Sequence, residues 1–226
     1  MSLAGKRIAI TGAFGSLGAA VVQAALAAGA QVAAIDRADP PADTHGARAI
    51  GGVDLADAAQ AKAAIDDAAK ALGGLDALVN IAGTFRFETL ADGSPDTWDL
   101  LYRINVRTAV AASKAALAHL PEGGRIVNIG AASALKAGAG VGAYTASKAG
   151  VLRLTESLAE ELKPRGITVN AVLPSIIDTP PNRRDMPKAD FAKWVKPAQL
   201  ADVIVFLLSD QASAITGALI PVTGRV

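Results

Sequence analysis

The chain has 226 residues, 22 lysines and arginines against 21 aspartates and glutamates, and no cysteine. This length fits one domain with a substantial core. A net charge of +1 gives no electrostatic basis for binding nucleic acid or an anionic membrane. The lack of cysteine excludes disulfides, thiol nucleophiles and thiolate metal sites, and neither His45 nor His119 has the partner spacing of a metal ligand. We therefore expect a protein that acts on a small molecule without a metal.

Short apolar runs alternate with alanine-rich helical stretches along the chain. We expect strands at 7–10, 31–35, 47–53, 76–79, 125–129, 167–172 and 217–222. We expect helices at 17–28, at 54–72 with Asp54 as its N-cap, and at 95–120, 142–163 and 197–209. This alternation predicts an α/β fold whose parallel sheet is covered on both faces. Because the first strand starts close to the N-terminus, we expect no signal peptide and a cytoplasmic location.

The segment between the first strand and the first helix is rich in glycine, with Gly12, Gly15 and Gly18. Glycines there permit a tight turn and let backbone N–H groups approach a pyrophosphate at the helix N-terminus. Asp36 ends the second strand, where a carboxylate accepts hydrogen bonds from ribose hydroxyls and repels a 2′-phosphate. This favours NAD(H). NADP(H) stays possible because Arg37 follows and can meet a phosphate.

Two further segments follow strands of the same sheet. Asp54 comes after the third strand and is either an adenine contact or a plain helix cap. The sequence NIAG at 80–83 closes the fourth strand, where the ligand crevice of an open parallel sheet is expected. Both segments are therefore candidates for contact with a nucleotide.

Tyr144 and Lys148 are four residues apart in an expected helix, so both side chains share one face. A phenol has a pKa of about 10 and is a poor acid or base at neutral pH. A nearby ammonium group lowers that pKa, as proton transfer to or from a carbonyl oxygen requires. The pair therefore predicts acid–base chemistry.

In combination, these segments resemble the short-chain dehydrogenase/reductase family over essentially the whole chain. The matching motifs are TGAFGSLG at 11–18, the acid at 36, Asp54-Leu55, NIAG at 80–83, INVRT around Asn105, YTASK at 144–148 and Pro174. The resemblance implies a Rossmann-type, doubly wound sheet of about seven strands, formed by residues 1–226 as one domain. It also implies a nicotinamide cofactor and hydride transfer at a carbon that bears oxygen.

The same resemblance implies roles for individual residues. Tyr144 would be the acid or base at the substrate oxygen, Lys148 would hold the nicotinamide ribose and lower the tyrosine pKa, and Asn105 would anchor a water of the proton relay. The implied cofactor-binding residues are Gly12, Gly15, Ser16, Leu17, Gly18, Asp36, Arg37, Asp54, Leu55, Asn80, Ala82, Gly83, Tyr144, Lys148, Pro174 and Thr179.

Two positions depart from the usual family pattern. Ala131 stands where the family usually has a serine that binds the substrate carbonyl. Ser133 lies two residues away and either substitutes for that serine or leaves its role unfilled. Ser16 stands where the glycine loop usually has glycine. Both departures, and the stretch DTPPNRRDMPKADFAKW at 178–194, are similar to the dihydropteridine reductase-like subgroup.

The segment 175–196, rich in proline and charge, is expected to be a substrate lid loop, and a surface excursion is the alternative. Met186, Phe191 and Trp194 suit a flat ligand, although the two aromatic rings equally suit anchoring the loop to the core. Ala131 and Ser133 complete the expected substrate contacts.

We therefore expect an NAD(P)H-dependent oxidoreductase that reduces a conjugated carbonyl or a quinonoid dihydropteridine-like substrate. A ketone or 3-oxoacyl thioester reductase is the first alternative, and a non-catalytic NAD(H)-binding regulator is the second. Family members associate through paired helices, so we also expect a homodimer or homotetramer, with helices 95–120 and 142–163 at the contact.

Overall fold

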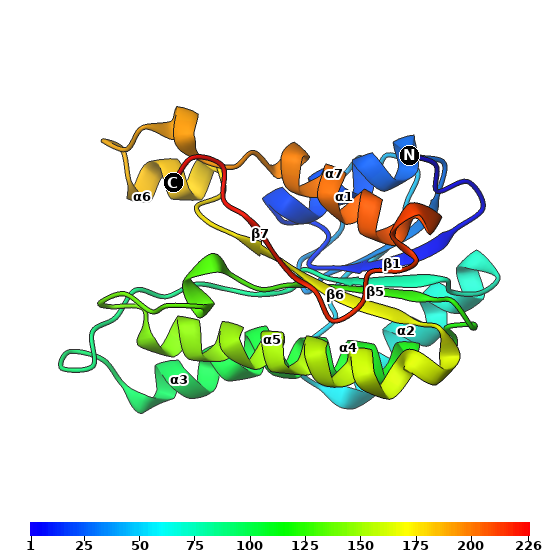
Figure 1. The fold of residues 1–226 in the computed structure, drawn as a ribbon, viewed down its shortest axis with the longest axis horizontal. Helices are drawn as coiled ribbons and strands as arrows, with labels where there is room; N and C mark the ends of the chain where they lie inside the picture. The colour runs from blue at the N-terminus through cyan, green and yellow to red at the C-terminus, as the bar shows by residue number, and fades with distance from the viewer.

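The computed structural model describes residues 1–226 and contains one parallel sheet of seven strands, in the order β3-β2-β1-β4-β5-β6-β7 (Figure 1). The strands are β1 Arg7–Thr11, β2 Gln31–Ile35, β3 Arg48–Ile50, β4 Ala77–Asn80, β5 Arg125–Ile129, β6 Thr168–Pro174 and β7 Leu219–Val222. This confirms the predicted Rossmann-type sheet. The edge strand β3 is shorter than the predicted 47–53.

Helices cover both faces of this sheet. The helices are α1 Ser16–Ala27, α2 Ala58–Leu72, α3 Pro95–Tyr102, α4 Thr108–Ala116, α5 Gly142–Leu162, α6 Pro180–Asp185 and α7 Pro197–Leu208. In Figure 1, α1 and α7 lie on one face, whereas α2, α4 and α5 lie on the other. None of these helices combines the length and the apolar character that crossing a membrane requires.

Each face of the sheet has its own apolar core, because successive strand side chains point to opposite sides. Val79 of β4 belongs to the cluster under α1 and α7, together with Ile204. Its neighbour Leu78 belongs to the cluster under α2, α4 and α5, together with Ile65 and Leu158. The central strands are therefore apolar on both faces, as a covered parallel sheet requires.

The chain reverses its direction across the sheet between β1 and β4. From β1 it proceeds through β2 to β3, and from β4 it proceeds the other way to β7. The chain therefore leaves β1 toward α1 on one face of the sheet and leaves β4 toward α4 on the other, which opens a crevice at the carboxyl edge. Gly12 has φ +64°, and a Cβ there would lie 2.6 Å from the backbone nitrogen of Ala82, so only glycine lets these loops meet.

The predicted N-cap of α2 is wrong by three positions. The cap is Asp57, whose carboxylate accepts hydrogen bonds from the backbone N–H groups of Ala59 and Gln60, both at 2.9 Å. Asp54 instead accepts a bond from the N–H of Ala56, two residues on. Asp54 forms a local turn of this kind because a short carboxylate competes well for nearby N–H groups.

The predicted continuous helix 95–120 is interrupted. A π-helical turn at Arg103–Arg107 separates α3 from α4, and α4 ends at Ala116. The predicted lid segment 175–196 is also more regular than expected, since it contains α6 and a 3₁₀ turn at Phe191–Lys193. A bridge between Ile177 and Val195 closes its base.

Candidate active site

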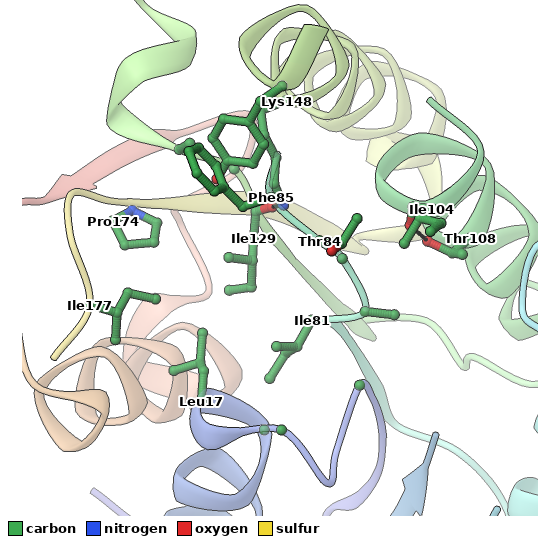
Figure 2. Close-up of a pocket in the computed structure, with 18 of the residues that line it drawn as sticks. Leu17, Ile81, Thr84, Phe85, Ile104, Thr108, Ile129, Lys148, Pro174 and Ile177 are labelled. Atoms are coloured by element: carbon green, nitrogen blue, oxygen red, sulfur yellow. Dashed lines mark hydrogen bonds between the residues drawn. The ribbon is translucent and has the colours of Figure 1, made fainter. Parts of the chain in front are cut away.

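A cavity of about 1020 Å³ lies in the crevice at the carboxyl edge of the sheet. Residues that follow six strands, β1 to β6, line it. In Figure 2, Leu17 at the start of α1, Ile81 after β4 and Ile129 at the end of β5 all point into it. The predicted site residues in its wall are Gly12, Gly15, Leu17, Gly18, Asp36, Arg37, Asp54, Leu55, Ala82, Gly83, Ala131, Ser133, Tyr144, Lys148, Pro174 and Met186. One cavity thus brings together most of the residues that the sequence selected.

The glycine loop brings the N-terminus of α1 to this cavity. The N-cap is Gly15, and no side chain caps the first turn, so backbone N–H groups there have no side-chain partner. A Cβ on Gly18 would overlap the carbonyl oxygen of Gly12, so the loop closes tightly under the helix. Uncapped N–H groups at the positive end of a helix dipole suit a pyrophosphate. Ser16, by contrast, is not part of the cavity wall.

Asp36 holds the loop between β1 and α1 while its carboxylate still faces the cavity. One carboxylate oxygen accepts a hydrogen bond from the N–H of Phe14 at 2.9 Å, and the other accepts one from the N–H of Ala38 at 3.1 Å. Each carboxylate oxygen has a second lone pair. The residue therefore has free acceptor capacity for ribose hydroxyls.

Asp54 lies in the same end of the cavity, but its carboxylate already has a partner. Its Oδ2 accepts a hydrogen bond from Arg103 Nη2 at 2.5 Å. Arg103 begins the π-helical turn, and Arg107 at the end of that turn donates from Nε to the carbonyl of Ala56 at 2.7 Å. The loop after β3 is thus tied to the π turn.

Tyr144 and Lys148 lie in the first two turns of α5, as the sequence predicts. Lys148 is buried, and its Nζ donates to the backbone carbonyl of Ile129 at 2.8 Å. Burial lowers the pKa of Lys148 to about 8. Burial also raises the pKa of Tyr144 to about 12. The shift of the phenol is opposite to the lowering that the sequence predicts, because desolvation of the phenolate is its cause.

The ring of Phe85 contributes to the packing of Tyr144. The two ring centroids are 4.9 Å apart and the planes meet at 76°, an edge-to-face contact. Phe85 itself is 50% exposed and lines the same cavity as Tyr144.

Asn105 lies in the middle of the π turn and is buried. Its side chain accepts from the N–H of Thr84 at 2.7 Å and donates to the carbonyl of Thr84 at 3.0 Å and to Ser147 Oγ at 2.9 Å. Ser147 Oγ in turn donates to the carbonyl of Tyr144 at 2.7 Å. Asn105 therefore joins the loop after β4 to the helix that bears Tyr144, and its side chain does not line the cavity.

Four more predicted site residues lie outside the cavity wall. Asn80 Nδ2 donates to Ser113 and Asn128 and so ties β4 to its neighbours. Thr179 caps α6. Trp194 is buried and packs on Phe191 with ring centroids 4.8 Å apart. The two aromatic rings thus favour the alternative of anchoring the segment 175–196.

Sequence reasoning missed several residues of the wall, notably Phe14, Thr84, Phe85 and Arg86. Three of them directly continue the NIAG motif beyond β4. Extension of that motif along the chain would have found them, since residues after a strand end at the switch point face the crevice. No sequence signal distinguished Phe14, whose backbone N–H donates to the carboxylate of Asp36.

The residues present fit a nicotinamide dinucleotide. The cavity offers an uncapped helix N-terminus, a carboxylate with free lone pairs at Asp36, and a buried ammonium group at Lys148 with N–H donors beyond the one that Ile129 accepts. Apolar side chains at Ile129 and Ile177 border the space between them.

Comparisons with known proteins agree with this fit. The sequence pattern of the family described as Enoyl-(Acyl carrier protein) reductase matches residues 12–224. The 2-(S)-hydroxypropyl-CoM dehydrogenase 3 of Xanthobacter autotrophicus is 37% identical, over 96% of this chain and 94% of that protein. The 3-oxoacyl-[acyl-carrier-protein] reductase FabG of Thermotoga maritima is 31% identical, over 99% and 98%.

A solved structure is also similar over nearly the full length. A short chain dehydrogenase from Burkholderia cenocepacia, in complex with NADP, is 35% identical with a TM-score of 0.87, and the match covers 99% of this chain and 98% of that one. The match to dihydropteridine reductase-like proteins stays a prediction. The fold, the cavity and these relatives together identify the chain as a member of the short-chain dehydrogenase/reductase family, whose NAD(P)-dependent oxidoreductase chemistry it shares.

Proposed function

We propose that this oxidoreductase reduces a conjugated, electron-poor carbonyl or a quinonoid dihydropteridine-like ring, with Tyr144 as proton donor and NAD(H) as the preferred cofactor. One observation carries the substrate class: Ala131 lines the cavity at the position where the family usually has a serine whose hydroxyl assists the substrate oxygen, and Ser133 is the hydroxyl nearest to it in the chain. A donor in such a role contributes about 3 kcal/mol in other enzymes. An acceptor that is easy to reduce depends least on that contribution.

The chemistry divides between the cofactor and the side chains. When bound, the nicotinamide supplies the hydride. The Tyr144 hydroxyl supplies the proton to the substrate oxygen, and its raised pKa of about 12 keeps it protonated at neutral pH. Lys148, with a pKa of about 8, is charged at neutral pH and has N–H groups free to hold a ribose hydroxyl. Asn105 positions α5 through Ser147.

The test is NADH and NADPH oxidation by the purified protein with a quinonoid dihydropterin, a quinone, a 1,2-diketone and a 3-oxoacyl thioester. We expect turnover with the first three, and Tyr144→Phe should lower it by about 10²–10⁴-fold, the usual contribution of a positioned proton donor. Tyr102→Phe is the matched control, because Tyr102 is exposed and outside the cavity.

The alternatives predict different outcomes of the same panel. A 3-oxoacyl thioester reductase, the activity that FabG of Thermotoga maritima has by name, turns over only the thioester. A non-catalytic regulator binds NADH and oxidises none with any acceptor. Either outcome would refute the proposed substrate class.

We also propose that the protein is a homodimer or homotetramer in the cytoplasm, with residues 175–196 as a lid over the substrate. Large apolar side chains on the helical face of α3 and α4 support the assembly, since Trp98 is 42% exposed and Val110 is 40% exposed. Burial of such side chains against a second copy is favourable. Asn182 and Met186 in the cavity wall support the lid.

A further inference from the structure

One arginine of the cavity wall has no assigned role in this chemistry. Arg86 lies two residues beyond Thr84 in the loop after β4, and it is an exposed residue that lines the cavity. The preceding residue, Phe85, contacts the ring of Tyr144. Arg86 is therefore beside the end of the cavity at which the substrate oxygen meets the phenol.

The guanidinium group of Arg86 is free of acidic partners. No carboxylate lies within salt-bridge distance, and its hydrogen bond is a long one, from Nη1 to the carbonyl of Phe85 at 3.3 Å. Arg183, in helix α6, is different: its Nε and Nη2 donate to Asp178 at 2.5 and 2.8 Å. Arg86 thus keeps most of its N–H donors for a ligand.

The other charged groups of the wall lie elsewhere. Asp36, Arg37 and Asp54 follow β2 and β3, at the adenine end. Near Tyr144 the wall has the cations Lys148 and Arg86 and no carboxylate. The substrate end is consequently electropositive. Of its two cations, only Lys148 has a role in the chemistry proposed above, and that role is to hold the ribose.

We propose that Arg86 determines specificity by binding an anionic group, such as a carboxylate or sulfonate, on the substrate whose carbonyl faces Tyr144. This inference rests on the proposed function, because it assumes that the substrate carbonyl lies at Tyr144. A guanidinium fork pairs with such oxyanions through two parallel hydrogen bonds. The contact exists before and during hydride transfer, so it strengthens substrate binding and leaves the chemical step unchanged.

The experiment measures binding without turnover. Calorimetric titration of the protein saturated with NAD⁺ compares 4-acetylbenzoate with 4-acetylbenzamide, a near-isosteric neutral ketone. We expect the wild type to bind the carboxylate about tenfold more tightly, a ratio that corresponds to one charge-assisted bond partly screened by water. Arg86→Gln should bring the ratio to about one, and Arg86→Lys should keep an intermediate ratio.

Arg184→Gln is the matched control, because it removes the same charge from an exposed arginine outside the cavity wall. Its binding ratio should equal that of the wild type. Equal binding of the two ketones by the wild type, including no measurable binding of either, would overturn the inference, as would an unchanged ratio in Arg86→Gln.

Turnover separates this inference from the proposed function. If the carboxylate preference depends on Arg86 but no acceptor is ever reduced, the anion site stands and the proposed reductase activity fails. If acceptors are reduced with the loss in Tyr144→Phe but the binding ratio is one, the activity stands and the anion site fails.

Discussion

Replacement of Asp36 tests how the site distinguishes NADH from NADPH. Its carboxylate stabilises the glycine loop through the N–H of Phe14 and presents its remaining lone pairs to the adenine end of the cavity. Asp36→Ala removes both functions, whereas Asp36→Asn removes the charge and keeps an acceptor for Phe14. The two variants therefore separate loop stability from cofactor choice.

The geometry sets the expected magnitude. A hydrogen bond to a charged group contributes about 1.5–3 kcal/mol. Asp36 is half-buried, so water competes and we take about 2 kcal/mol for the ribose hydroxyls together, or about thirtyfold in affinity. For NADPH, the change removes repulsion between a carboxylate and a 2′-phosphate and leaves Arg37 free to pair with that phosphate.

The assay is kcat/KM for each cofactor with one fixed acceptor. We expect the NADH/NADPH ratio to fall by at least about thirtyfold in both variants. Thermal unfolding should show Asp36→Ala to be less stable than Asp36→Asn by about 1 kcal/mol, the contribution of the Phe14 bond. An unchanged NADH/NADPH ratio in both variants would refute the assignment of cofactor preference to Asp36.

Two further predictions concern stability and assembly. Asp76 receives hydrogen bonds from Arg7 Nε and Nη2, both at 2.8 Å, and this pairing lowers the pKa of Asp76. Asp76→Asn should therefore cost about 1 kcal/mol at neutral pH. Because the pKa of Asp76 is lower in the folded state, the stability difference between the wild type and Asp76→Asn should be present above a pH of about 3.9 and should vanish as the pH falls through the folded pKa. A difference in urea unfolding that does not change with pH would contradict this. Light scattering should give the mass of a dimer or tetramer, and a monomer mass would contradict the assembly. Trp98→Glu should give smaller species than the wild type.

The sequence predicted the sheet and the nucleotide half of the cavity well, for physical reasons. β5 is buried along its whole length and has three apolar residues of five, as a covered parallel strand requires. Gly12 has no substitute, because a Cβ there would overlap the backbone of Ala82. Other predictions were wrong because two nearby residues suit the same role. Asp54 and Asp57 both suit an N-cap. Only the fold determines that Asp54 pairs with Arg103 and that Asp57 caps α2.

The substrate half was predicted less well, because its residues act through contacts that no spacing encodes. The π turn around Asn105 and the contact of Phe85 with Tyr144 both arise from packing between separate elements. Sequence spacing places Tyr144 and Lys148 on one helix face, but it gives no information about burial. Burial is the reason that the phenol pKa is raised and not lowered.

That raised pKa bears on the direction of the reaction. Oxidation of an alcohol needs a base, and a phenol with a pKa of about 12 is rarely ionised at neutral pH. Reduction needs a proton donor, and the same phenol is fully protonated and still more acidic than the alcohol it forms. Burial of Tyr144 therefore supports the proposed reduction, and the lack of a hydroxyl at Ala131 supports the proposed acceptor, which needs little help at its oxygen. The raised pKa thus bears on the proposed direction, and Ala131 bears on the proposed class of substrate.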